Sequence, residues 1–463
     1  MIRWFSIIAV IVLVLGPISG CGEREAEDAV GESREPLWPC PTGNFVGDNV
    51  TPFGCPTTPK VSWSVELPGA KCTPPIVDDA GRIIVGTSEG VKCFSPEGEF
   101  VWTTEVSSHI NAGPALDNHS RIVVPYGDTV TFINLDGSKI TTQKISKLAA
   151  HHPTVDSEGN IYIYCMEPVD ISQVGPNPPE DLPAESNFRG HIYVFDHEFK
   201  QIEHIETGII NCPMRVKGKD GQTSGVYYAP KLFDKWRPET ESDPVFWKTT
   251  LLSTSEDFRP VPLHEIEHGV VDMFTDRDGI LHLFGHIEHL PLPEELNIPT
   301  NEYGFVYKVQ SFFCKPETGE LHKEHWPWMT PEEPATGTYK KFRKHFNRVR
   351  FYHMAKGMDA FKSALGAGED EEHKGCHHGP GENVLDEVKE FVKGCWYLII
   401  SETGRMLGGT ESIKCFDVAS NKVIWEIDGD PSSIALAGDG LMYCLERFAD
   451  DDKCVLKCYA DKG

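Results

Sequence analysis

The sequence predicts an all-β protein, a seven-bladed β-propeller that carries a helical insertion. The first observation is a repeat: similar segments begin at Pro75, Pro114 and Pro153 and recur every 39 residues. Each has a short apolar strand, a turn led by Asp and a β-branched or aromatic strand, and two more strand patterns follow. Four strands in every ~40 residues are typical of a propeller blade.

The second observation is a strand pattern, at 60–67, that belongs to none of the four-strand repeats. The repeat continues more loosely through residues 212–326 and resumes at 395–427, whereas the last stretch, 432–460, supplies only three strands. The missing strand is available at 60–67, and pairing it with 454–459 would close the ring and remove both free edges. This count predicts seven blades, with six and eight as alternatives.

Side-chain alternation along 60–67 indicates which residues the closing strand buries. Val61, Trp63 and Val65 lie on one face of a strand because successive side chains point to opposite faces. We expect all three to be buried against the neighbouring blade.

The N-terminus has the pattern of an export signal. An apolar run of about a dozen residues follows Arg3, which is shorter than the ~20 residues that a membrane span needs. "ISGC" then resembles the lipobox of bacterial lipoproteins, with Cys21 as the lipidated residue. The predicted organisation is a signal peptide at 1–20, an acidic tether and Cys loop at 21–59, and the propeller at 60–463, with a predominantly helical insert at about 330–394.

Composition limits the partners. The chain has 43 Lys and Arg against 70 Asp and Glu, a formal net charge of −27. Phosphate neutralisation needs a basic face, so nucleic acid is excluded as a partner. We expect a protein or polysaccharide partner in the bacterial cell envelope, with membrane contact through the lipid anchor, in the outer membrane facing the periplasm or the surface.

The chain has fourteen cysteines, which together with an export signal indicates an oxidising compartment. Cys40 and Cys55 flank a loop rich in Gly and Pro that has too little apolar content to fold alone. A disulfide between them is the expected staple. Cys93, Cys415 and Cys458 recur at one strand position and are interpreted as small buried core residues.

The insert has two helical patterns. Apolar residues of 339–365 follow helical spacing, and 383–394 repeats it with acidic residues early, so we expect a helical hairpin. The first half of 339–365 is basic within an acidic protein, which suggests a partner site; the alternative is a solvated face. The candidate partner-binding residues are Lys340, Lys341, Arg343, Lys344, Arg348 and Arg350.

A literal H-E-x-x-H occurs at His264, Glu265 and His268. In zinc proteases this motif works only on a helix, where the two histidines lie one turn apart. Pro260 and Pro262 disfavour a helix here, and in an extended strand the histidines lie ~13 Å apart. One zinc ion cannot bridge that distance, so we interpret the motif as a coincidence.

Histidines recur where the innermost strands begin, at the mouth of the expected central channel. They could bind a polar ligand or a divalent metal, and the alternative is a set of solvated loop residues. The candidates are His109, His151, His152 and His268. A second, weaker metal candidate is an exposed cluster formed by His373, Cys376, His377 and His378. No cofactor is expected.

The stretch "KCFDVASNKVIW" (414–425) resembles the repeat of the pyrroloquinoline-quinone-like propellers. Asp417 ends a strand, Ser420 and Asn421 form the turn, and Trp425 docks between blades; Trp102 belongs to a weaker copy. Quinone dehydrogenases of that fold tend to carry adjacent cysteines, and no Cys-Cys pair exists here. The chain also distantly resembles the propeller lipoprotein of the outer-membrane barrel-assembly machinery, and this resemblance implies a scaffold role.

"DRDGILHLFGH" (276–286) also resembles the Asp-x-Asp-Gly-x-x-His turns of sialidase-like and lyase propellers, although Asp-x-Asp-Gly is common in hairpins. The leading hypothesis is therefore an exported, lipid-anchored propeller that acts as a non-catalytic binding or scaffold module, with no catalytic residues assigned. The alternatives are a carbohydrate-active enzyme and a quinone-dependent dehydrogenase.

Overall fold

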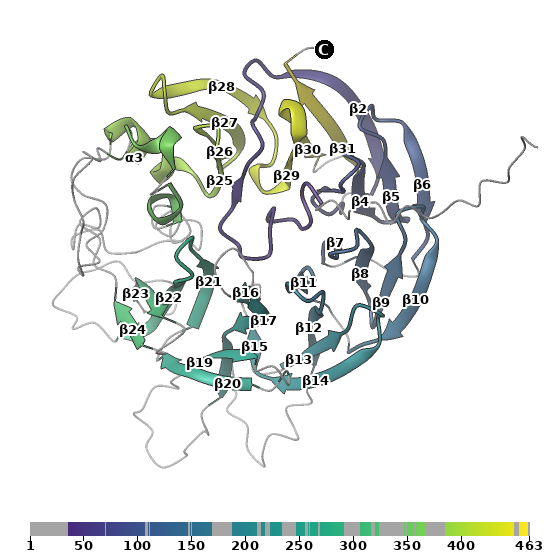
Figure 1. The fold of residues 1–463 in the computed structure, drawn as a ribbon, viewed down its shortest axis with the longest axis vertical. Helices are drawn as coiled ribbons and strands as arrows, with labels where there is room; N and C mark the ends of the chain where they lie inside the picture. The colour runs from purple at the N-terminus through teal and green to yellow at the C-terminus, as the bar shows by residue number, and fades with distance from the viewer. Residues whose placement is uncertain are drawn as a thin grey trace, which may run out of the picture. The chain divides into compact units, whose positions relative to one another are not determined.

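Small antiparallel sheets make up most of the described chain. The computed structural model describes residues 36–463 without 70, 107–109, 111, 147, 148, 150, 169–187, 211–213, 218–222, 234–246, 255–257, 259, 267, 268, 291–305, 316–319, 324–346, 348, 349, 356, 357, 364, 366–384, 449–452, 462 and 463. Within the unit Glu35–Gly463, the described strands form seven sheets that follow one another around a common centre (Figure 1). This arrangement is a β-propeller.

Sheets one to three correspond to the three 39-residue repeats. Sheet one is β3 (Ile76–Val77), β4 (Ile83–Thr87), β5 (Gly90–Phe94) and β6 (Phe100–Thr104). Sheet two is β7 (Ala115–Leu116), β8 (Ile122–Tyr126), β9 (Thr129–Ile133) and β10 (Lys139–Lys144). Sheet three is β11 (Thr154–Val155), β12 (Ile161–Pro168), β13 (Phe188–Phe195) and β14 (Gln201–Thr207). The innermost strands are buried and the outermost are largely exposed.

Sheets four and five contain the loosely repeating middle of the chain. Sheet four is β15 (Ile209–Ile210), β16 (Arg215–Lys217), β17 (Thr223–Tyr228), β18 (Pro230–Phe233), β19 (Trp247–Thr254) and β20 (Pro260–Ile266). Sheet five is β21 (Gly269–Thr275), β22 (Leu281–Leu290), β23 (Val306–Lys315) and β24 (Glu320–Lys323). The loose repeat predicted for 212–326 therefore corresponds to two sheets, with six described strands in sheet four and four in sheet five.

Sheets six and seven complete the ring. Sheet six is β1 (Val50–Thr51), β25 (Tyr397–Ser401), β26 (Arg405–Gly409), β27 (Ser412–Asp417) and β28 (Lys422–Asp428), in which β1 pairs in parallel with β25. Sheet seven is β29 (Ile434–Ala437), β30 (Leu441–Phe448), β31 (Lys453–Ala460) and β2 (Lys60–Pro68). Short 3₁₀ turns η6 (Pro431–Ser433) and η7 (Gly438–Gly440) flank β29.

The predicted closing strand is present. β2 pairs antiparallel with β31, with Trp63 opposite Cys458 and Val65 opposite Leu456. The expected burial of Val61, Trp63 and Val65 is not met: Trp63 and Val65 are half-buried, and Val61 is 48% exposed because the register shifts between Val61 and Trp63. A bulge of this kind places the next side chain off the alternating face.

Tryptophans hold neighbouring sheets together, as the sequence predicted. Trp102 of sheet one donates its indole N–H to the Leu135 carbonyl of sheet two at 2.9 Å. Trp425 of sheet six donates to the Pro56 carbonyl at 2.7 Å, and Trp63 donates to the Pro96 carbonyl at 2.8 Å. Large amphipathic side chains suit this role because the ring fills space while the N–H finds an acceptor.

The centre of the ring contains residues 36–55, here called the central segment (Figure 1). Its backbone exchanges hydrogen bonds with Val77 and accepts the N–H groups of Leu116, Val216, Thr275 and Ile400. These partners lie in or beside the innermost strands of sheets one, two, four, five and six. The predicted Cys loop is therefore part of the propeller interior, because these innermost strands have backbone groups that need partners.

The described part of the insert lies beside sheet six. Asn347 and residues 350–355 are helical, η5 spans Asp359–Phe361, and α3 spans Asp386–Gly394. Phe351, Met354 and Phe361 form one apolar cluster with Val388 and with residues of sheet six. The rest of the expected hairpin lies outside the described residues. None of the helices described here has the length and apolar character that a membrane crossing requires.

Candidate functional site

The histidines predicted at the channel mouth do not form one described site. His109 and His268 lie outside the described residues. His151 Nε2 lies 3.2 Å from the Ile210 carbonyl and its ring stacks on Tyr164, whereas His152 Nδ1 lies 3.0 Å from the Pro153 carbonyl. Burial lowers the pKa of His151 to about 4 and the pKa of His152 to about 3, so both are neutral at pH 7.

The H-E-x-x-H stretch is extended where it is described. His264 and Glu265 lie in β20, with His264 opposite Leu251 of β19. His268 lies outside the described residues. The zinc-protease motif requires a helix that places its two histidines one turn apart, and the strand at His264 and Glu265 does not provide that spacing.

A different group of side chains converges on the end of β21. An aspartate closes the turn after the innermost strand of four described sheets: its Oδ1 accepts the backbone N–H groups two and four residues further on, at 2.8–3.0 Å. The four aspartates are Asp78, Asp117, Asp156 and Asp276. In each of these aspartates, the second carboxylate oxygen, Oδ2, can accept a hydrogen bond from a side chain.

Sheet five differs from sheets one and two in which side chain reaches that second oxygen. In sheets one and two, Arg82 and Arg121 donate Nε–H to Oδ2 of Asp78 and Asp117, each at 2.7 Å. The residue at the corresponding position of sheet five is Ile280, which carries no charge. The cation found in the first two sheets is therefore missing from this position.

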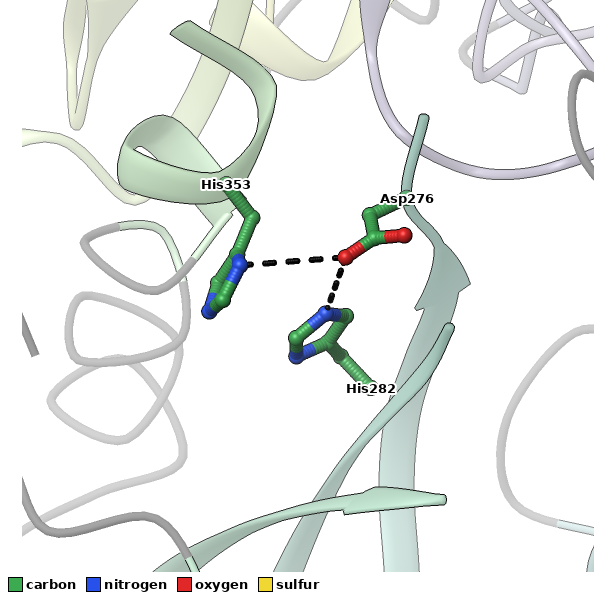
Figure 2. Close-up of side chains that lie close together, drawn as sticks. All are labelled: Asp276, His282 and His353. Carbon is green, nitrogen blue, oxygen red and sulfur yellow. Dashed lines mark hydrogen bonds and ion pairs between the residues drawn. The ribbon is translucent and has the colours of Figure 1, made fainter. Parts of the chain in front are cut away.

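Two histidines surround Asp276 instead. His282, on β22, donates from Nε2 to Asp276 Oδ2 at 2.8 Å, and His353 of the helical insert places Nδ1 at 3.7 Å from the same oxygen (Figure 2). The side chains of Asp276 and His282 are 4% and 1% exposed, and that of His353 is 15% exposed. We call these three residues the Asp–His–His cluster; their ligand atoms all lie within 4.8 Å of one another.

The charge state of Asp276 follows from its neighbours. Burial alone would raise the pKa of this carboxyl, but the hydrogen bond and charge of His282 and the charge of His353 outweigh burial and lower the pKa. Asp276 is thus an ionised carboxylate between two imidazoles. A carboxylate with two imidazole nitrogens is a donor set that suits Zn²⁺ and related transition metals.

A buried ion cluster next to the site holds the insert in place. Asp272 Oδ1 accepts from Arg215 Nη2 at 3.3 Å, and its Oδ2 accepts from Arg350 Nη2 at 3.2 Å. Gly47 of the central segment lies directly on Arg215, so a Cβ there would be 2.2 Å from the guanidinium. Central segment, sheet four, sheet five and insert therefore meet around Asp272.

This contact corrects one candidate partner residue. Arg350 is 1% exposed and bonded to Asp272, so it cannot present its charge to a partner. Its position on the helical face that packs against sheet five explains the burial. Lys340, Lys341, Arg343, Lys344 and Arg348 lie outside the described residues, as do His373, Cys376, His377 and His378.

No functional site was predicted from the sequence at 276–286, although the stretch was recognised as a motif. The Asp-x-Asp-Gly-x-x-His spacing contains Asp276 and His282 and was the available signal. His353 carried no signal, because only the folded insert brings it beside sheet five.

The expected disulfide between Cys40 and Cys55 is wrong: both are free thiols. Cys40 Sγ contacts Thr42 Oγ1 at 3.4 Å, and Cys55 Sγ lies 3.3 Å from Cys415 Sγ of β27. The central segment runs across the ring between Cys40 and Cys55, and this path separates the two. The hydrogen bond from Cys415 lowers the pKa of Cys55, and the same contact raises that of Cys415.

Oxidised glutathione is expected to link Cys55 to Cys415. The two thiols lose two protons and two electrons, and the oxidant becomes two reduced glutathione molecules. The sulfurs must approach from 3.3 Å to about 2.05 Å. Peptide mapping without reductant should find this pair, and Cys415→Ser should abolish it, whereas Cys72→Ser should not. A Cys40–Cys55 peptide would contradict this expectation.

Comparisons with known proteins identify similar folds only. No known protein family and no curated protein matches the sequence. Among solved structures, the chain is similar to a europium-containing methanol dehydrogenase, with 9% identity over 92% of this chain and 98% of that chain and a TM-score of 0.42. It is also similar to the Myceliophteria thermophila Cps50 (Swd1) β-propeller domain, with 6% identity over 87% and 99% of the two chains and a TM-score of 0.41. Neither likeness transfers an activity.

Proposed function

We propose that this protein is an exported, lipid-anchored, seven-bladed β-propeller that acts as a non-catalytic binding or scaffold module in the bacterial cell envelope. The observation that supports this proposal best is the path of the central segment. Propellers enclose a central channel, and here the chain's own backbone bonds to the inner strands of five sheets. Ligands are then expected on the rim and outer faces, where protein and polysaccharide partners fit.

The described residues give less support to the two enzymatic alternatives. The carbohydrate-active hypothesis depends on the turn at 276–282, whose Asp276 holds the same turn as Asp78, Asp117 and Asp156 in other sheets. A shared structural role accounts for that motif without a sugar. The quinone-dependent hypothesis requires a bound quinone cofactor, and we assign no residue to binding it.

The proposed membrane localisation is tested through lipidation of Cys21. Mass spectrometry of the mature protein from bacterial membranes should find an N-terminal Cys21 that carries a diacylglyceryl group. Cys21→Ser should shift the protein from the membrane fraction to the soluble fraction, whereas Gly22→Ala should leave it lipidated. A mature N-terminus elsewhere than Cys21 would contradict the anchor.

The scaffold role is tested through the basic part of the insert. In-cell crosslinking followed by purification should capture a defined envelope partner with the unmodified protein. A variant with Lys340, Lys341, Arg343 and Lys344 changed to Glu should lose that partner while keeping its melting temperature. Turnover of an envelope polysaccharide by the purified protein would contradict the non-catalytic assignment.

A further inference from the structure

We propose that the Asp–His–His cluster is a binding site for one divalent transition-metal ion, with Zn²⁺ as the best match, and that this ion pins the helical insert to sheet five. The ligand atoms are Asp276 Oδ2, His282 Nε2 and His353 Nδ1 (Figure 2). This inference is independent of the scaffold role and of the lipid anchor.

The distances fit an ion with short bonds. Ligands at about 2.0–2.2 Å from a tetrahedral zinc lie roughly 3.3 Å from one another. In the cluster, Asp276 Oδ2 lies 2.8 Å from His282 Nε2 and 3.7 Å from His353 Nδ1. These two separations fall on either side of the ideal, and all three ligand atoms lie within 4.8 Å of one another, so coordination requires the imidazole rings to rotate toward a common centre.

The donor set selects the class of metal. Two imidazole nitrogens and one carboxylate oxygen suit zinc, iron, cobalt and nickel, whereas calcium and magnesium prefer oxygen ligands. Three protein ligands also leave at least one coordination position for water or for a further ligand.

The surroundings hold the three ligands in place. Asp276 Oδ1 is occupied by the backbone N–H groups of Asp278 and Ile280, each at 2.9 Å, which leaves Oδ2 for the ion. Phe274 stacks on His282, with ring centroids 4.8 Å apart at an interplanar angle of 11°. The hydrogen bonds orient the Asp276 carboxylate, as outer-shell hydrogen bonds do for metal ligands, and the ring contact supports His282.

The insert brings its histidine to the site through two matched contacts. Arg350 and His353 are three residues apart and share one helical face. Asp272 lies within β21 and Asp276 directly follows that strand, four residues later; Arg350 reaches the first and His353 the second. The helical segment therefore lies along this end of sheet five, and the Arg350–Asp272 pair fixes where His353 stands.

Sheets one and two place a cation on the corresponding aspartate oxygen, whereas in sheet three Asp156 Oδ2 accepts from the neutral side chains of Asn160 and Tyr162. Asp78 and Asp117 each have an arginine on Oδ2, and Asp276 has Ile280 at the corresponding position. A metal ion would supply, at Asp276, the positive charge that Arg82 and Arg121 supply in the first two sheets. The alternative source of that charge is a protonated histidine, and the test below separates the two.

Zinc binding to the full-length, metal-stripped protein provides the test. Titration with Zn²⁺ alone, followed by equilibrium dialysis and elemental analysis, should give one zinc per chain. Co²⁺ should produce the visible absorption of a four-coordinate site. His282→Gln and His353→Gln should each weaken zinc binding at least about tenfold and remove the increase in melting temperature that zinc causes.

Two controls make the result specific. His204→Gln changes a histidine of sheet three that lies 3.1 Å from His191, and it should leave zinc binding unchanged. A variant with His373, Cys376, His377 and His378 changed to Ala should also keep the zinc. Circular dichroism must show that His282→Gln and His353→Gln are folded before their zinc affinities are compared.

Two results would overturn the proposal. One is a stripped wild-type protein that takes up no zinc, which would leave the cluster as a charged hydrogen-bonded contact. The other is zinc that is retained by His353→Gln and lost in the variant of 373–378. Neither result bears on lipidation or on partner capture, so the proposed function is tested separately.

Discussion

A variant that begins at residue 70 is expected to aggregate or remain unfolded. It lacks β2 and therefore leaves the outer edge of β31 unpaired along Lys453–Ala460. Leu67 is fully buried in β2, and a buried Leu contributes ~1.5–3 kcal/mol. The variant also lacks Trp38, for which replacement of a buried Trp by Ala costs about 3–5 kcal/mol. These losses are comparable to the ~5–15 kcal/mol that stabilises a typical domain.

A series of N-terminal truncations separates two contributions to stability: ring closure by β2, and filling of the centre by residues 36–55. A variant that begins at residue 36 keeps both and should melt like the mature protein. A variant that begins near residue 57 keeps β2 but loses the buried Trp38, Cys40 and Val46. It should melt well below the 36-start variant. A folded 70-start variant with an unchanged melting temperature would show that β2 does not close the ring.

Asp272→Ala is expected to destabilise the protein by about 3–5 kcal/mol, the usual effect of breaking a buried ion pair. The substitution leaves the guanidinium groups of Arg215 and Arg350, each 1% exposed, without their shared carboxylate. Two buried positive charges then repel each other in a region of low dielectric. Urea unfolding should show a lower midpoint with an unchanged slope.

The control for this substitution is Asp359→Ala. Its carboxylate pairs with Lys362 but is 91% exposed, so the change should leave the urea midpoint almost unchanged. Asp272→Asn keeps an acceptor and should lie between the two. If Asp272→Ala unfolds at the same urea concentration as Asp359→Ala, the insert does not depend on this charge.

Much of the fold followed from local patterns. Alternating apolar residues marked the strands, and the turns led by Asp were predicted because their hydrogen bonds join residues only two and four apart. Closure by 60–67 was predictable because a strand pattern without a partner must find an edge. Burial in the closing strand was predicted less well: Trp63 and Val65 are half-buried, and Val61 is exposed because the bulge beside it depends on pairing with β31.

The candidate site could be predicted only in part. Asp276 and His282 lie six residues apart in one hairpin, and their spacing was visible as a motif. His353 is on another element, and nothing in its own surroundings indicates that it reaches Asp276. The same reason explains the error at Arg350: a basic run on a predicted helix is usually solvated, and only packing against sheet five showed that this arginine is buried.

The sequence by itself determined the repeat, the strands within each blade, the turn chemistry and the strand that closes the ring, because these depend on side-chain alternation and on hydrogen bonds between near neighbours. Tertiary structure decided the path of residues 36–55 through the centre, the contact of Cys55 with Cys415 across 360 residues, and the meeting of His353 with Asp276. These contacts join segments that are far apart in the chain. Which distant segments meet is set by how whole sheets and the insert pack, and that information is not contained in any single stretch of residues.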